Sequence, residues 1–190
     1  GGANTLFLAK KYPNSNFLGV DISDSLLKLG KKYLTKDKII KNLKFKKEDW
    51  QNIHKYKNIY DGIISFQTLS FLPFSHKKSL KNLKKKYFKF LAFSSLFYDG
   101  KCNYKIEIDD FSIKKNQSEK FKYIFSIESV KKLLRKNGYK SFKYINFDID
   151  MNLKKPSHGG MESYTKKLKN GKNIIFSGGL FLPYGFILAY

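Results

Sequence analysis

Cysteine, arginine and long apolar runs are scarce in this chain of 190 residues. Cys102 is the only cysteine, which excludes a disulfide framework and a thiolate metal cluster. A single thiol fits a reducing compartment, so we expect a cytoplasmic protein. The one sizeable apolar run, residues 178–190, is too short to span a membrane and is interrupted by Pro183. We therefore expect no membrane span and no metal site.

The basic side chains are almost all lysine. The formal net charge is +23, yet Arg135 is the only arginine. Nucleic-acid recognition favours arginine, because its planar group binds phosphates and bases through paired hydrogen bonds. We interpret the lysine excess as solvated surface and expect no specific nucleic-acid partner, while an anionic partner stays open.

Apolar residues make up 42% of the chain, enough for the core of one domain. Segments with helical spacing alternate with segments typical of strands. The expected helices are 4–12, 23–34, 75–88 and 126–139, and the expected strands are 16–23, 42–50, 60–71, 88–97, 140–150 and two runs after 172. This order predicts one α/β domain over 1–190, with a mostly parallel sheet that ends in an antiparallel strand.

A glycine pair precedes the first expected helix, and an acid ends the first expected strand. Such a turn lets the backbone approach a ligand and directs free N–H groups toward it. Gly2 and Asp21 lie 19 positions apart, close to the spacing between such a turn and a ribose-binding acid. NAD enzymes and S-adenosylmethionine enzymes share this spacing. A plain turn with a helix-capping aspartate is the structural alternative.

Three features favour S-adenosylmethionine over NAD. Residues 3–5 lack the third glycine of a dinucleotide-binding fold. Asp49 and Trp50 place an acid and a ring after a strand, which suits the amine and the face of an adenine. The hairpin-like end of the chain is also unusual for a dinucleotide-binding fold.

The order of the glycine pair, FLGVDIS (17–23), KKEDW (46–50) and YDGIISFQTLSFL (60–72) resembles the class I S-adenosylmethionine-dependent methyltransferases over about residues 1–100. The resemblance implies a Rossmann-like sheet flanked by helices, methyl transfer, and one family role for each matching residue. By position in the family, Gly1 and Gly2 would form the loop around the methionine part of the cofactor, and Asp21 would bind the ribose. Ile22, Asp49 and Trp50 would contact the adenine, and Phe66 and Gln67 would lie beside the methyl group.

The family's first strand and the start of its glycine loop have no counterpart before Gly1. We therefore expect an N-terminally truncated chain without the first strand. A truncated domain without activity is one alternative to an enzyme.

Residues 94–111 and the chain's end resemble uncharacterised bacterial methyltransferases found beside surface-polysaccharide genes. This resemblance implies a small or sugar-like acceptor. The connections 98–118 and 151–172 are long and polar, and we expect them to carry specificity. His158 and Asp99 lie there and are the candidate bases for an acceptor hydroxyl, while nearby lysines suit an anionic acceptor.

An RNA methyltransferase is the second alternative, because lysine is abundant. Enzymes that methylate base amines carry an Asn/Asp-Pro-Pro-aromatic segment at the position where this chain has SFQTL (65–69). The difference argues against base N-methylation and leaves ribose and ring-carbon methylation open.

Overall fold

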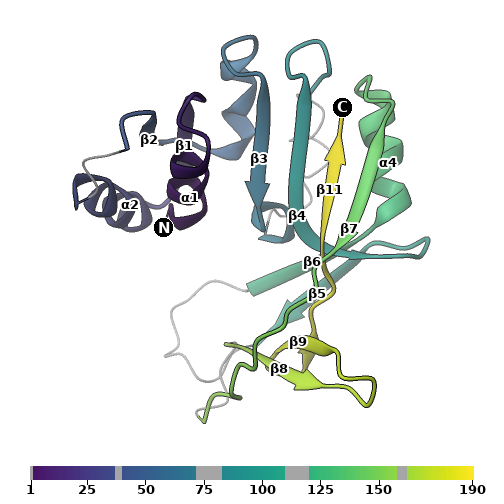
Figure 1. The fold of residues 1–190 in the computed structure, drawn as a ribbon. Coiled ribbons are helices and arrows are strands. Elements are labelled where there is room, and N and C mark those ends of the chain that lie inside the picture. The colour runs from purple at the N-terminus through teal and green to yellow at the C-terminus, as the bar shows by residue number, and fades with distance from the viewer. Residues whose placement is uncertain (1, 37–39, 72–82, 110–119, 158–161) are drawn as a thin grey trace. The chain divides into compact units, whose positions relative to one another are not determined.

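The computed structural model describes residues 2–36, 40–71, 83–109, 120–157 and 162–190 (Figure 1). The chain forms two compact units, residues 1–57 and 58–190. Within the described ranges, no helix is long and apolar enough to cross a membrane. The single domain expected from the sequence stays a prediction.

The first unit is a two-stranded parallel sheet with two helices. Its elements are α1 (Ala3–Lys11), β1 (Phe17–Asp21), α2 (Asp24–Lys36), β2 (Leu43–Lys47) and the 3-10 helix η1 (Trp50–Tyr56). Ala9, Ile40 and Leu43 form its buried core. The Asn42 amide donates to the carbonyls of Ala9, Tyr12 and Ser15, which ties the end of α1 to the start of β2.

The second unit is built on a six-stranded sheet. Its strands are β3 (Gly62–Phe66), β4 (Phe90–Tyr98), β5 (Tyr104–Ile108), β6 (Lys120–Ser126), β7 (Phe142–Asn146) and β11 (Tyr184–Ala189). β3 and β6 pair in parallel with β4, and β11 lies between β4 and β7, antiparallel to both (Figure 1). The predicted antiparallel C-terminal strand is confirmed.

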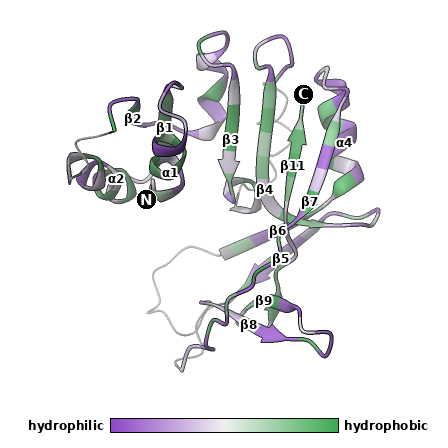
Figure 2. Ribbon diagram, in the orientation of Figure 1, coloured by the Kyte–Doolittle hydropathy of each residue, from purple (hydrophilic) through white to green (hydrophobic). Residues whose placement is uncertain are grey.

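Apolar strands and one amphipathic helix make the core of this unit. β4 and β11 are hydrophobic along much of their length (Figure 2), and Leu91 and Phe93 of β4 are fully buried. The helix α4 (Ile127–Lys136) begins where Ser126 Oγ accepts the Ser129 N–H, and it ends before Gly138, whose φ is +94°. The sequence predicted this helix and both of its ends.

Each of the two polar connections contains a strand, β5 within 98–118 and β8 (Ser163–Lys167) within 151–172, so the expectation of loops is wrong there. β5 and β6 make an antiparallel hairpin, and β8, β9 (Asn173–Ser177) and β10 (Leu180–Phe181) make a three-stranded antiparallel sheet. Leu96, Ile175 and Leu182 join this small sheet to the large one. Of the helix expected over 75–88, residues 75–82 lie outside the described part and 85–87 form a turn.

Candidate functional site

Gly2 occupies a position in the first unit that only glycine fits. It precedes α1 with φ +85°, a left-handed conformation that other residues rarely adopt. A Cβ there would lie 2.7 Å from Phe45 Cζ and 3.3 Å from Gly30 Cα. The left-handed backbone and the packing of Phe45 therefore both require glycine at this position. Gly1 lies outside the described residues.

Asp21 is the last residue of β1 and is half-buried. Its Oδ1 accepts the Ser23 N–H at 2.9 Å, and its carbonyl accepts the Glu48 N–H at 3.1 Å. Oδ2 makes no hydrogen bond to a described residue. Ile22 follows with 66% of its surface exposed, so an apolar side chain stands open beside the acid.

Asp49 follows β2, and Trp50 begins η1 with its ring half-buried. Asp49 Oδ1 accepts the Gln51 N–H at 2.8 Å and caps η1, while Oδ2 makes no hydrogen bond to a described residue. Glu48, between β2 and Asp49, binds neighbouring groups of the chain with its carboxylate. Its Oε1 accepts from the Asn52 amide and the Asp49 N–H, and these bonds lower the pKa of the Glu48 carboxyl.

These residues fit the adenosine part of S-adenosylmethionine. Asp21 ends β1 and Asp49 follows β2, the parallel neighbour of β1, so both lie at the carboxyl edge of the small sheet. Each uses one carboxylate oxygen locally and keeps the other for a ligand donor. The glycine turn, the two acids, Ile22 and Trp50 all belong to the first unit.

Gln67 in the second unit has strained backbone. It follows β3 with φ +58°, the left-handed region that side chains disfavour. Its N–H donates to Ser94 O at 2.8 Å and Ser94 Oγ at 3.1 Å, and its carbonyl accepts from Ser70 Oγ at 2.8 Å. Such strain persists where surrounding bonds enforce it, and it gathers at functional sites. Phe66 beside it is 38% exposed.

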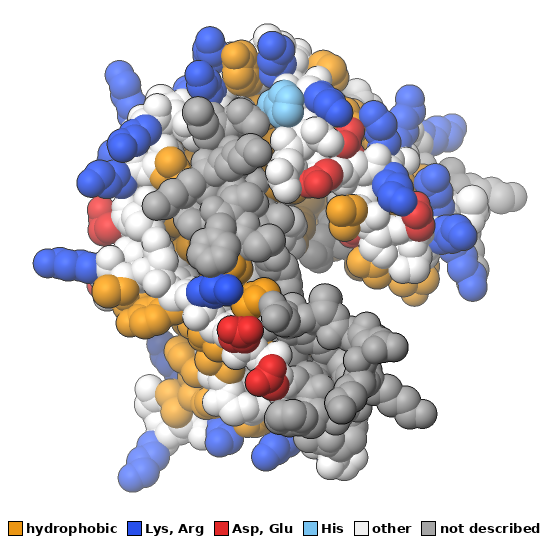
Figure 3. Space-filling model, turned by 180° about the vertical axis from the view of Figure 1, so that it is seen from behind, with side chains coloured by type: hydrophobic (Ala, Val, Ile, Leu, Met, Phe, Trp, Pro, Cys, Tyr) orange, Lys and Arg blue, Asp and Glu red, His pale blue; other side chains and the backbone are white. Residues whose placement is uncertain are grey.

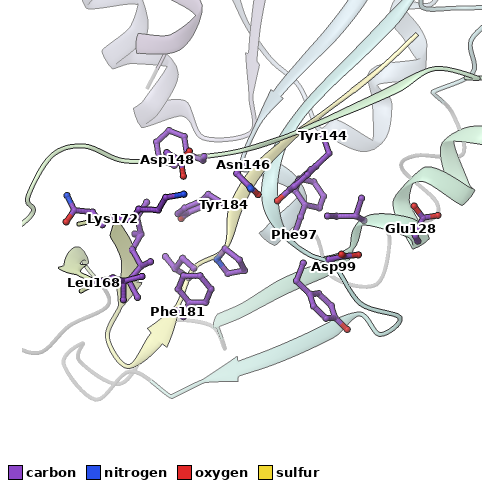
Figure 4. Close-up of a pocket in the computed structure, with 18 of the residues that line it drawn as sticks. Phe97, Asp99, Glu128, Tyr144, Asn146, Asp148, Leu168, Lys172, Phe181 and Tyr184 are labelled. Carbon is purple, nitrogen blue, oxygen red and sulfur yellow. The ribbon is translucent and has the colours of Figure 1, made fainter. Parts of the chain in front are cut away.

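A groove of about 620 Å³ lies at the carboxyl edge of the six-stranded sheet (Figure 4). We call it the sheet-edge groove; its walls come from residues within 97–99, 127–131, 144–148, 168–175 and 181–184. These are the ends of β4 and β7, the start of α4, and the small sheet with the beginning of β11. Ligands of open α/β folds bind at this edge.

Tyr144 and Asp99 both line the groove. Burial and the nearby Asp99 charge raise the pKa of the Tyr144 hydroxyl, so it stays protonated and can donate a hydrogen bond. The Tyr144 ring packs over Gly185, where a Cβ would lie 2.7 Å from Cε2, and meets Phe97 edge-on at 6.2 Å. This packing fixes the hydroxyl in place.

Acids and amines share the groove walls. Glu128 pairs with Lys131 at 3.3 Å and with Arg135 at 3.8 Å, so its charge is balanced locally. Asp99 and Asp148 add two further carboxylates, and Lys172 adds an amine. Among the acceptor-site candidates from the sequence, Asp99 lies in the groove, and His158 falls outside the described residues.

Sequence reasoning missed Tyr144 and Asp148, as well as the serines that hold Gln67. A usable signal was present for the first two. In the expected strand 140–150, alternate positions share one face, which places Tyr144, Asn146 and Asp148 together near the carboxyl end.

The sequence profile of the methyltransferase domain family matches residues 1–175, across both units. The chain belongs to this methyltransferase domain family. Membership confirms the predicted resemblance to the methyltransferases. The predicted Rossmann-like fold class is shared by the solved structures that follow, and the predicted S-adenosylmethionine cofactor agrees with both findings.

Solved structures with the same fold include an S-adenosylmethionine-dependent methyltransferase from Methanosarcina mazei, at 12% identity and TM-score 0.60, covering 97% of this chain and 85% of that one. YcgJ from Bacillus subtilis has 12% identity and TM-score 0.58, covering 92% and 82%. No curated protein sequence matches the chain.

The cyclase SpnF shares the fold at 11% identity and TM-score 0.57, over 76% of this chain. The chain spans about half the length of SpnF, 49%. SpnF is named for a cyclisation. The fold alone therefore does not determine the reaction, and the function has to be inferred from the residues of the site.

Proposed function

We propose that this protein transfers the methyl group of S-adenosylmethionine to a hydroxyl of a small polar acceptor bound in the sheet-edge groove. The observation that carries the proposal is the placement of Asp99 and Tyr144 in the wall of one groove at the carboxyl edge of the sheet. The cofactor, when bound, supplies a methyl group already activated on a sulfonium. The chain therefore has to align the acceptor and exclude water.

Asp99 and Tyr144 have different roles toward the hydroxyl of the acceptor. The Asp99 carboxylate accepts the proton that the hydroxyl loses as its oxygen takes the methyl group. The Tyr144 O–H donates to an oxygen of the acceptor and holds it in line. His158 remains a proposed base as well.

The proposed cofactor contacts are those that the sequence predicts. Asp21 accepts from the ribose hydroxyls, Asp49 accepts from the adenine amine, and Trp50 and Ile22 flank the ring. The turn at Gly1 and Gly2 faces the methionine part. Phe66 and the strained Gln67 contact the region of the methyl group.

The finer proposal is a sugar hydroxyl on an anionic precursor. Lys172 lines the same groove as Asp99 and supplies an amine for a phosphate, whereas the Lys131 amine is paired with Glu128. The resemblance of 94–111 to methyltransferases beside polysaccharide genes supports a sugar.

The test is methyl transfer from labelled S-adenosylmethionine to sugar nucleotides, bulk RNA and protein. Label should enter a sugar nucleotide, and Asp99→Asn should reduce the rate about a hundredfold or more, the range of general base catalysis. Asp109→Asn, at an exposed acid outside the groove, is the control and should keep full activity. Label that enters only RNA or protein would contradict the small acceptor. Full activity in Asp99→Asn would remove Asp99 as the base.

A further inference from the structure

Three large apolar side chains stay open in the sheet-edge groove. Phe147, Leu168 and Phe181 are 43%, 42% and 46% exposed, and all three line it. They come from three separate segments: the residue after β7, the turn between β8 and β9, and β10. Exposed apolar side chains that gather at one site mark a binding surface rather than chance.

Neighbouring contacts hold this apolar wall in place. The Phe147 ring meets Tyr184 edge-on at 6.3 Å, and Phe181 lies 6.0 Å from Phe176. The turn that carries Leu168 is closed by two backbone bonds: the Leu168 N–H donates to Lys172 O at 2.7 Å, and the Leu168 carbonyl accepts from Gly171 N at 3.0 Å. A fixed wall loses little conformational freedom when a ligand covers it.

The two ends of the groove differ in chemistry. Figure 4 shows Asp99, Tyr144 and Glu128 toward α4, and Leu168 and Phe181 at the opposite end, where the charged Lys172 and Asp148 also lie. A volume of about 620 Å³ falls within the range of small-molecule sites. A ligand that fills both ends needs hydrogen-bonding groups on one side and an apolar group on the other.

We propose that the acceptor is amphipathic: a hydroxyl-bearing sugar joined to an apolar ring or short chain that lies against Phe147, Leu168 and Phe181. This inference rests on the proposed function for the identity of the hydroxyl end. It adds that a free, wholly polar sugar fills only half of the site and binds more weakly.

The test compares two probes, phenyl β-glucoside and methyl β-glucoside, which share the sugar and differ in the apolar group. Their affinities for the full chain are measured by NMR titration. The phenyl compound should bind about tenfold more tightly, the gain expected from partial burial of one ring. Phe181→Ser and, separately, Leu168→Ser should each remove most of this preference. Tyr190→Ser, at a 49% exposed aromatic outside the groove, should leave it unchanged.

Equal affinity for the two glucosides, binding of neither, or a preference that survives both groove variants overturns the proposal. Thermal melts identify a variant that fails to fold, and the two groove substitutions lie in different segments. The outcome is separate from that of the methyl-transfer assay. A phenyl preference without methyl transfer to any acceptor would sink the proposed function alone, and methyl transfer without a phenyl preference would sink this inference alone.

Discussion

Replacing Gln67 with glycine tests whether the end of β3 is strained for function. The left-handed backbone of Gln67, φ +58°, costs a residue with a side chain about 1–2 kcal/mol. Glycine removes that cost but loses about 0.5–1 kcal/mol through its freer unfolded chain. The free energy of unfolding of Gln67→Gly should therefore stay level or rise by up to about 1.5 kcal/mol. Affinity for S-adenosylhomocysteine should fall about two- to tenfold, the worth of one lost hydrogen bond.

Asn58→Gly is the matched control, because Asn58 has φ +60° and lies outside the predicted site. The free energy of unfolding of Asn58→Gly should change by no more than that of Gln67→Gly, and its affinity for S-adenosylhomocysteine should equal that of the wild type. Urea unfolding and calorimetric titration measure the two quantities. A Gln67→Gly protein destabilised by more than about 1 kcal/mol would refute the account of strain. Unchanged affinity would show that the strained residue does not serve the cofactor.

Three further outcomes are expected. Asp49→Ser keeps an N-cap for η1 but cannot reach an adenine amine, so S-adenosylhomocysteine should bind about tenfold more weakly at unchanged stability; a loss of stability with intact affinity would make Asp49 purely structural. Single-stranded RNA should bind weakly, without sequence preference and with steep salt dependence; nanomolar binding to one RNA at physiological salt would contradict this. Burial raises the pKa of Tyr139, Tyr144 and Tyr184. Above pH 10 the tyrosines of the unfolded chain ionise first, so the contribution of these residues to stability should be complete below pH 10 and lost as pH rises above it. Unfolding midpoints that stay constant between pH 9 and pH 11 would exclude this contribution.

The sequence predicted the elements whose local signals agree with their packing. α4 has an N-cap serine, three buried apolar positions and a terminal glycine, and its bounds match closely. β4 and β11 are continuous or alternating apolar runs, and both are central strands. In these segments local preference and burial favour the same structure.

The strands β5, β6 and β8 were missed because lysine hides their alternation, whereas β9 is one of the two strands expected after residue 172. In β8 the strand SYTKK has one buried residue, Tyr164, and its pairing with β9 is non-local. The groove was missed because its walls are also non-local: they join residues from β4, β7 and β10, which lie far apart in the chain. Figure 3 shows lysine and arginine spread across the visible face rather than gathered over one element, in keeping with their interpretation as solvated charge.

The central claim is that this chain holds S-adenosylmethionine through the acid that ends β1. Calorimetric titration of S-adenosylhomocysteine into the wild-type chain, Asp21→Asn and Asp24→Asn tests it most directly. In Asp21→Asn the side-chain carbonyl of the new amide can still accept the Ser23 N–H, so the local turn should survive while the charged acceptor for the ribose is lost. The account predicts about ten- to a hundredfold weaker binding for Asp21→Asn. It predicts wild-type affinity for Asp24→Asn, at the exposed acid that pairs with Lys47. Equal affinity in all three proteins, or no binding to the wild-type chain, would contradict it.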